Sequence, residues 1–204
     1  MEQETFGTFI EDNATCLKMI RKAAWDLHKN VNQTYGGVHP YGYHLSMVAG
    51  IALNHAFRII ENKADILPVV FAAFFHDSIE DARLTYNDVK AMAREYMNEA
   101  QAHTAAEIVY ALTNEKGRTR EERAGERYYE GIRQTSYAPF VKMCDRMANM
   151  AYSFQESDSD NNRMREVYAK EWPRFLEKIT VRGDDARFGI PQEMIAAVEE
   201  LLAM

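Results

Sequence analysis

The sequence has little of what marks a secreted or membrane-spanning protein. Its two cysteines, Cys16 and Cys144, lie in helix-like patterns without CxxC spacing, so we expect reduced packing residues in a cytoplasmic protein. The longest apolar run, Ile66–Phe75, is far shorter than the roughly 20 residues that span a bilayer. The first residues, MEQETFGTFIEDNATC, are acidic and polar, so we expect no secretory signal peptide.

Basic residues are also scarce relative to acidic ones. The chain of 204 residues has 24 Lys and Arg against 31 Asp and Glu, for a net charge of −7. This balance predicts neither a general nucleic-acid binder nor a membrane-surface protein, although it leaves room for a small anionic ligand in a local basic pocket. With 47% hydrophobic and 27% charged residues, the composition is that of an ordinary globular domain.

Sequence repeats, low-complexity runs and strand patterns are absent, and nearly every segment has a helical period. We therefore predict an all-α fold, a single bundle of about 8–10 helices. Residues 1–180 would form the domain, and residues 181–204 a loop and helix packed on it. The glycine-rich stretch NQTYGGVHPYGYH interrupts the pattern, and Thr85 with Asp88 predicts a capping box. Helices are expected at 13–30, 44–60, 66–75, 86–97, 100–112, 119–133, 137–154, 161–179 and 191–204.

The apolar run ends abruptly in ionisable residues, in the stretch FFHDSIEDARLTYNDV. If the helix continues, His76, Asp77, Glu80 and Asp81 lie on one arc and face a common point. Three carboxylates that close repel one another, and a divalent cation removes the conflict. Imidazole with carboxylate suits Mn, Fe, Zn or similar metals. The alternative is that these residues cap the helix in solvent, which is the commoner meaning of a lone His-Asp pair.

A second polar group lies in VKMCDRMANM, where Lys142, Asp145 and Asn149 share a helix face. An aspartate within an apolar helix needs a partner or a metal, so a buried pair with Lys or Arg is the alternative here. A third candidate is His44, at the start of a helix in PYGYH. His55 is its rival, because eleven residues return it to within about 20° of the same helix face.

The order His44, His76-Asp77, Asp145 resembles the metal-binding pattern of the HD-domain phosphohydrolases. The quoted segments are similar to PYxxH, LLHDxxEDTxxTxxxV and VKLADRLxNL in the hydrolase domain of RelA/SpoT-type alarmone enzymes. The likeness runs in the same order over about residues 20–179. The combination of HDxxED with DRxxN is more specific than HD alone. The resemblance implies an HD-domain helical bundle and a stand-alone small alarmone hydrolase.

The resemblance also assigns roles to residues. Glu80 and Asp81 match the pair that holds and deprotonates the attacking water, and which of the two is the base stays open. The family usually binds manganese, and another divalent metal remains an alternative. The metal ligands would be His44, His76, Asp77 and Asp145. By the resemblance, Asn149 would touch the nucleotide sugar, Arg146 would brace the site or meet phosphate, and His28 and Lys29 fall where the family places basic residues. An anionic substrate also needs cations, for which Lys142 and Lys116 are candidate substrate contacts; the alternatives are an acidic partner for Lys142 and a solvated helix face for Lys116.

The activity implied is that of a (p)ppGpp 3′-pyrophosphohydrolase, which gives GDP or GTP and pyrophosphate and belongs to the stringent response. The partner is then a small nucleotide, with neither nucleic acid nor membrane, and self-association stays open. One departure affects the substrate: NVNQTYGGVHPYG stands where alarmone hydrolases carry a basic RKxxG-like string. Hydrolysis of another nucleotide, such as NADPH or a nucleoside phosphate, and a non-catalytic nucleotide sensor are therefore alternatives.

Overall fold

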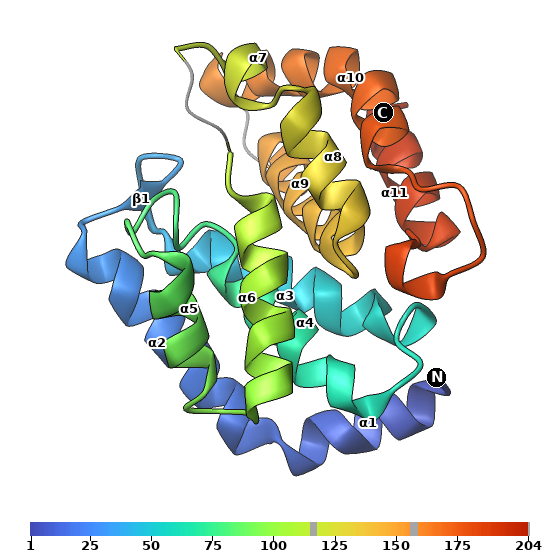
Figure 1. Cartoon of the computed structure of the whole chain (residues 1–204). Helices are drawn as coiled ribbons and strands as arrows, with labels where there is room; N and C mark the ends of the chain where they lie inside the picture. The colour runs from blue at the N-terminus through green and yellow to red at the C-terminus, as the bar shows by residue number, and fades with distance from the viewer. Residues whose placement is uncertain (115–117, 156–158, 204) are drawn as a thin grey trace.

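The computed structural model describes residues 1–114, 118–155 and 159–203, and the prediction of an all-α fold is confirmed (Figure 1). The helices are α1 (Gln3–Asp12), α2 (Ala14–Asn30), α3 (Gly42–His55), α4 (Ile66–Phe75), α5 (Tyr86–Ala93), α6 (Glu99–Leu112), α7 (Arg120–Arg123), α8 (Glu126–Gln134), α9 (Ala138–Gln155), α10 (Ser159–Ile179) and α11 (Gln192–Leu202).

The apolar helix α4 lies in the centre of the molecule. Every one of its residues is buried, and it packs against α2, α3, α6 and α9. Within it, the rings of Phe71 and Phe75 stack with their centroids 4.1 Å apart. Because a helix that is apolar on all sides is stable only when surrounded, the sequence forces α4 into the core. Its last turn therefore delivers the residues that follow Phe75 to the middle of the bundle.

The glycine-rich stretch after α2 forms a small hairpin. Strands β1 (Thr34–Tyr35) and β2 (His39–Pro40) pair antiparallel, with Gly36 and Gly37 at positive φ in the turn between them. The expectation that the chain has no strand is therefore wrong at this point. A strand of two residues is too short to show the alternation by which strands are recognised in a sequence.

Three helical expectations need adjustment, and one local prediction is confirmed. The polar start of the chain forms α1, which buries Phe6 against Phe57. The segment predicted as one helix at 119–133 contains two, α7 and α8. Helix α4 ends at Phe75, so the acidic residues beyond it do not continue the helix. The capping box of Thr85 and Asp88 forms as predicted at the start of α5.

The last helix, α11, packs against α9 and buries Met194 and Val198 in the common core. Glu193, at its start, lies 2.9 Å from His55 Nδ1 and 3.2 Å from an Arg58 nitrogen. His55 therefore faces the C-terminal helix rather than the centre of the bundle. In residues 1–114, 118–155 and 159–203, no helix combines the length and apolar character needed to cross a membrane.

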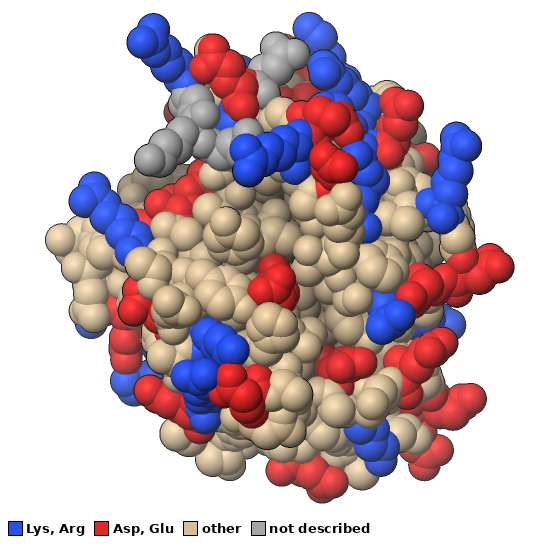
Figure 2. All heavy atoms as spheres, viewed as in Figure 1, with Lys and Arg blue, Asp and Glu red and all other residues tan. Residues whose placement is uncertain are grey.

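The molecular face drawn in Figure 2 carries charges of both signs. Lysine and arginine side chains are interspersed with aspartate and glutamate around a mostly uncharged central area, in which an acidic side chain is visible. This mixture agrees with the modest net charge of −7. On this face the charge pattern is that of a solvated surface rather than of a uniform basic stripe.

Candidate active site

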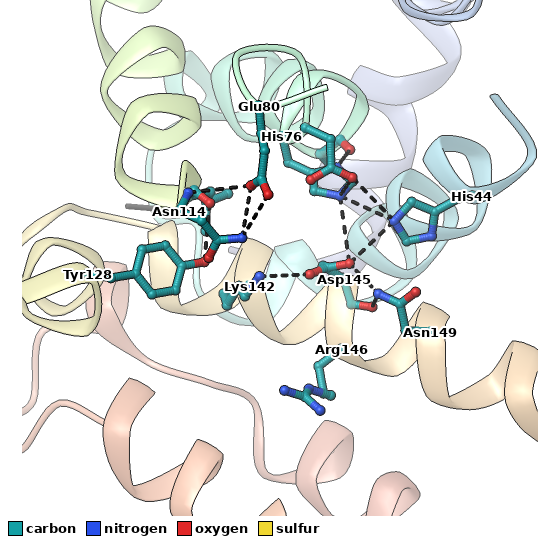
Figure 3. A network of polar contacts seen from close by, with 12 residues as sticks. His44, His76, Glu80, Asn114, Tyr128, Lys142, Asp145, Arg146 and Asn149 are labelled. Atoms are coloured by element: carbon teal, nitrogen blue, oxygen red, sulfur yellow. Dashed lines mark hydrogen bonds and ion pairs between the residues drawn. The ribbon is translucent and has the colours of Figure 1, made fainter. Parts of the chain in front are cut away.

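Four metal-type donors from three separate segments meet at the end of α4, and Figure 3 labels three of them, His44, His76 and Asp145. His44 comes from α3, His76 and Asp77 follow α4 directly, and Asp145 lies on α9. His44 Nε2 is 3.3 Å from His76 Nε2 and 3.3 Å from Asp145 Oδ1. His76 Nε2 lies 2.9 Å from Asp77 Oδ2 and 3.7 Å from Asp145 Oδ1. The structure thus brings together all four residues expected as metal ligands.

The two imidazoles are held in place by different contacts. His76 Nδ1 lies 3.0 Å from the carbonyl oxygen of Ala73, which turns Nε2 of the same ring toward the other donors. His44 is instead fixed by stacking: the ring of Tyr35 lies over it at 4.7 Å and 20°. Nδ1 of His44 is buried and has no hydrogen-bond partner among the described residues. Each histidine therefore presents Nε2 to the same point.

Burial and close contact between ionisable groups shift the pKa values of the cluster residues. Burial opposes the imidazolium of His76, but the carboxylates of Asp77 and Asp145 outweigh it and raise its pKa to about 10. Burial also opposes the ionised form of Asp77, yet the neighbouring His76 holds the pKa of this carboxyl well below its usual range. Without a metal, a proton on His76 thus supplies the positive charge between two carboxylates.

A divalent cation fits this donor set. Metal bonds of about 2.1 Å place neighbouring ligand atoms about 3.0–3.4 Å apart, which is close to the observed separations of 2.9–3.7 Å. One ligand atom from each of His44, His76 and Asp145 lies within 4.8 Å of the others. Two imidazoles and two carboxylates suit transition metals such as Mn, Fe or Zn. A divalent metal site is therefore what these residues support best, without a choice among the metals.

The acidic pair after His76 and Asp77 is arranged differently from the helical expectation. Because α4 ends at Phe75, Glu80 and Asp81 lie in the turns that follow it rather than on a continued helix. Glu80 is exposed, and its two carboxylate oxygens accept hydrogen bonds of 3.0 and 2.9 Å from Nδ2 of Asn114. The prediction that all four side chains share one helical arc is therefore wrong, since the two acids diverge.

Asp81 is half-buried and lies near Gln33 and Tyr41, the residues that flank the hairpin. Burial and the negative charge of Asp77 raise the pKa of its carboxyl, while the neighbouring polar side chains of Gln33 and Tyr41 lower it. The net effect is an increase in pKa. A carboxylate with a raised pKa is better matched to accepting a proton near neutral pH than an ordinary one.

Two of the expected substrate contacts lie at the centre but are engaged with Asp145. The ammonium of Lys142 is 2.9 Å from Asp145 Oδ2, so the predicted alternative of a buried lysine pair coexists with the cluster. Nδ2 of Asn149 donates to Asp145 Oδ1 at 2.6 Å, and its Oδ1 accepts from the Tyr35 hydroxyl at 3.0 Å. The carboxylate of Asp145 is thus contacted by side chains one turn before it and one turn after it on α9.

The other expected substrate contacts do not converge on the cluster. Figure 3 shows that Arg146 points away from the cluster. Its guanidinium bonds Glu171 at 3.0 Å and packs 4.2 Å from the centre of the Phe175 ring. His28 is buried, and its ring stacks under that of Tyr41 at 4.8 Å. Two lysines remain: Lys29 is exposed and Lys116 lies outside the described residues.

Two tyrosines with clear contacts in the site were missed by sequence reasoning. The hydroxyl of Tyr41 donates to Asp77 Oδ2 at 2.5 Å, and Tyr35 bridges His44 and Asn149 from the hairpin. Tyr41 precedes His44 by three residues, so helical spacing was a signal for it. Tyr35 carried no comparable signal, because only the hairpin turn brings it back over α3.

The rival histidine is placed elsewhere. His55 pairs with Glu193 on α11 and takes no part in the cluster. His44 and His76 are 1% and 2% exposed, so the alternative of solvated helix-capping residues does not describe them.

Comparison with solved structures gives a likeness in fold, whereas comparison with family models and curated proteins does not. No family model matches the chain, and no curated protein matches it. One similar solved structure is described as a metazoan ortholog of SpoT that hydrolyzes ppGpp and plays a role in starvation responses. The two chains are 21% identical, the likeness covers 92% of this chain and 97% of that one, and the TM-score is 0.59. At this identity the likeness shows the shared helical fold.

Proposed function

We propose, from the fold shared with a ppGpp hydrolase and from the chemistry of the cluster, that this protein is a metal-dependent phosphoric ester hydrolase. The substrate we propose first is (p)ppGpp, cleaved at its 3′-pyrophosphate to GDP or GTP and pyrophosphate. The observation that carries the proposal is the convergence of four donors, His44, His76, Asp77 and Asp145, from three separate segments. A manganese ion is the cofactor that the sequence resemblance suggests.

A divalent metal bound there would polarise a phosphate oxygen and lower the pKa of water, as metals do in other hydrolases. The chain supplies the remaining groups. Glu80 and Asp81 are the carboxylates proposed to hold a water and take its proton as its oxygen bonds to phosphorus. The bond from phosphorus to the 3′-oxygen then breaks, and that oxygen leaves as a hydroxyl once it is protonated. Either carboxylate is placed to take that proton: Asp81 has a raised pKa, and Glu80 is held in position by Asn114.

Lys142 and Asn149 are proposed to contact the substrate beside the metal. Lys142 is a cation at the cluster, and an ammonium beside Asp145 is placed to meet a phosphate oxygen that enters the site. Asn149 has an amide in contact with Asp145 and with Tyr35, at the boundary between the cluster and the hairpin. The resemblance to the alarmone hydrolases suggests that this amide contacts the sugar of the nucleotide.

A specific observation favours a second candidate, a phosphatase of another nucleotide. The hairpin carries aromatic side chains where the alarmone hydrolases carry a basic string: Tyr35 stacks on His44, and His39 stacks on Tyr43 at 4.6 Å. Arg146, one of the cations expected to contact the substrate, forms an ion pair with Glu171 of α10. A ligand with fewer phosphates than ppGpp, such as a nucleoside phosphate or NADPH, needs fewer cations.

The test is a turnover assay with the purified full chain, loaded with Mn²⁺. The substrates are ppGpp, NADPH and a panel of nucleoside phosphates, with phosphate and pyrophosphate measured separately. The variant Asp77→Ala is expected to lose both bound metal and turnover. Asp26→Ala is the matched control, because Asp26 lies in an exposed pair with Lys22 on α2.

The three outcomes separate the candidates. Release of pyrophosphate from ppGpp alone supports the alarmone reaction, and turnover of another compound keeps the site and replaces the substrate. Metal and nucleotide binding without any product would favour a nucleotide sensor. Full turnover by Asp77→Ala would contradict the proposal of a metal-dependent hydrolase.

A further inference from the structure

Just after helix α6, the side-chain amide of Asn114 donates hydrogen bonds to the carboxylate of Glu80. Nδ2 of Asn114 lies 3.0 and 2.9 Å from the two carboxylate oxygens of Glu80, and the backbone N–H of Asn114 lies 3.4 Å from Oε2. Figure 3 shows Glu80 directed at Asn114. Within the part of the chain that the structure describes, Glu80 makes no hydrogen bond or ion pair with a residue other than Asn114. An exposed glutamate without such a partner would sample several rotamers.

The amide is itself held by the fold. Asn114 follows α6 by two residues, and the carbonyl oxygen of Leu112 at the helix end accepts the hydroxyl of the buried Tyr128 at 3.1 Å. The preceding Thr113 bonds back to the Val109 carbonyl at 3.1 Å. The segment that carries the amide is therefore tied to α8 as well as to its own helix.

The same tyrosine connects this support to the metal cluster. The ammonium of Lys142 lies 5.7 Å from the centre of the Tyr128 ring and 2.9 Å from Asp145 Oδ2. One set of contacts thus runs from Asp145 through Lys142 and Tyr128 to the end of α6. The position of the amide relative to the cluster is consequently set by packed side chains rather than by a free loop.

We propose that Asn114 is a positioning residue for the reaction, which orients the carboxylate of Glu80 toward the water that it holds. The inference rests on the proposed function and adds a residue to it. Donation from one amide to both oxygens fixes the plane of the carboxylate, and a base must be within hydrogen-bond reach of the proton that it accepts. Asn114 acts through Glu80 and does not contact the reacting atoms.

The kinetic test is a double-mutant cycle with Asn114→Ala and Glu80→Gln. Asn114→Ala is expected to lower kcat about tenfold, with KM and metal content unchanged, as expected when an acid–base group loses its orientation. In the Glu80→Gln background the same substitution should have no further effect on kcat. Asn114→Asp, which places a second carboxylate beside Glu80, should also move the acidic limb of the pH–rate profile to higher pH.

The matched control is Asn98→Ala at the other end of the same helix. Asn98 caps α6 by accepting from the Gln101 N–H at 3.0 Å, so its loss weakens α6 without touching Glu80. This variant should melt at a lower temperature, with kcat per folded molecule unchanged. If Asn98→Ala and Asn114→Ala lower kcat equally, Asn114 serves only the stability of α6 and the inference is overturned.

An NMR titration tests the contact between Asn114 and Glu80 even if the purified protein has no measurable turnover. In the ¹⁵N NMR spectrum, the side-chain amide of Asn114 should shift as the Glu80 carboxyl titrates, and this shift should vanish in Glu80→Gln. A flat titration in the wild-type chain overturns the inference. Full activity in Asn114→Ala beside an inactive Glu80→Gln overturns it as well, while leaving the proposed hydrolase function in place. Full activity in Glu80→Gln removes the role of both residues, with Asp81 as the remaining base.

Discussion

The hydroxyl of Tyr41 offers the sharpest test of how the cluster is held together. It donates to Asp77 Oδ2 at 2.5 Å, and the tyrosine ring stacks on that of His28 at 4.8 Å. Tyr41→Phe removes the hydrogen bond and leaves the ring in place. A hydrogen bond to a charged group contributes about 1.5–3 kcal/mol. Because about 1.4 kcal/mol corresponds to a tenfold change in affinity, the loss predicts divalent-metal binding weaker by about 10–100-fold.

The assay is calorimetric titration of the metal-free protein with Mn²⁺ at fixed pH, for the wild type and for Tyr41→Phe. Tyr110→Phe is the control, because Tyr110 is 60% exposed on α6 and lies apart from the cluster. The control should bind Mn²⁺ with wild-type affinity. An unchanged affinity in Tyr41→Phe would refute the reasoning that this hydroxyl orients Asp77 as a ligand.

Three further predictions concern protonation and stability. Metal binding should release protons at pH 7 and strengthen as pH rises toward about 10, because the carboxylates hold the pKa of His76 at about 10 and the metal must displace that proton; titration in buffers of different ionisation enthalpy measures the release. Phe71→Ala should lower the free energy of unfolding by about 3–5 kcal/mol, because it removes a fully buried ring stacked on Phe75; urea denaturation measures this. Thr85→Ala should cost about 1 kcal/mol by the same measurement, because it breaks the capping box with Asp88, and turnover should be unchanged.

The fold class was readable in advance because helices have a local signature. The periodic apolar residues of α2, α9 and α10 and the uninterrupted run of α4 mark these helices directly, since each must bury its apolar face. The division of 119–133 into α7 and α8 and the hairpin of β1 and β2 left no periodic signal. Helix α1 was missed because its residues are largely polar. Phe6 is the one residue of this helix that is buried.

The residues of the four-donor cluster could be singled out in the sequence for a chemical reason. Histidine and aspartate at the ends or in the middle of apolar helices are costly to bury, so their presence marks a site that needs a partner. This reasoning applies to His76, Asp77 and Asp145, and the resemblance to the HD-domain phosphohydrolases added His44 ahead of His55. The tertiary structure then distinguished these two histidines, because His55 pairs with Glu193 of α11 and so lies outside the cluster.

What the sequence alone determined is thus an all-α chain with a buried central helix and an ionisable cluster at its end, because periodicity and the cost of buried charge are properties of local sequence. Only the tertiary structure decided which side each polar group faces. It ended α4 at Phe75, separated Glu80 from Asp81, and turned Arg146 toward Glu171 on α10. These directions depend on contacts between segments distant in the chain, which no local pattern records.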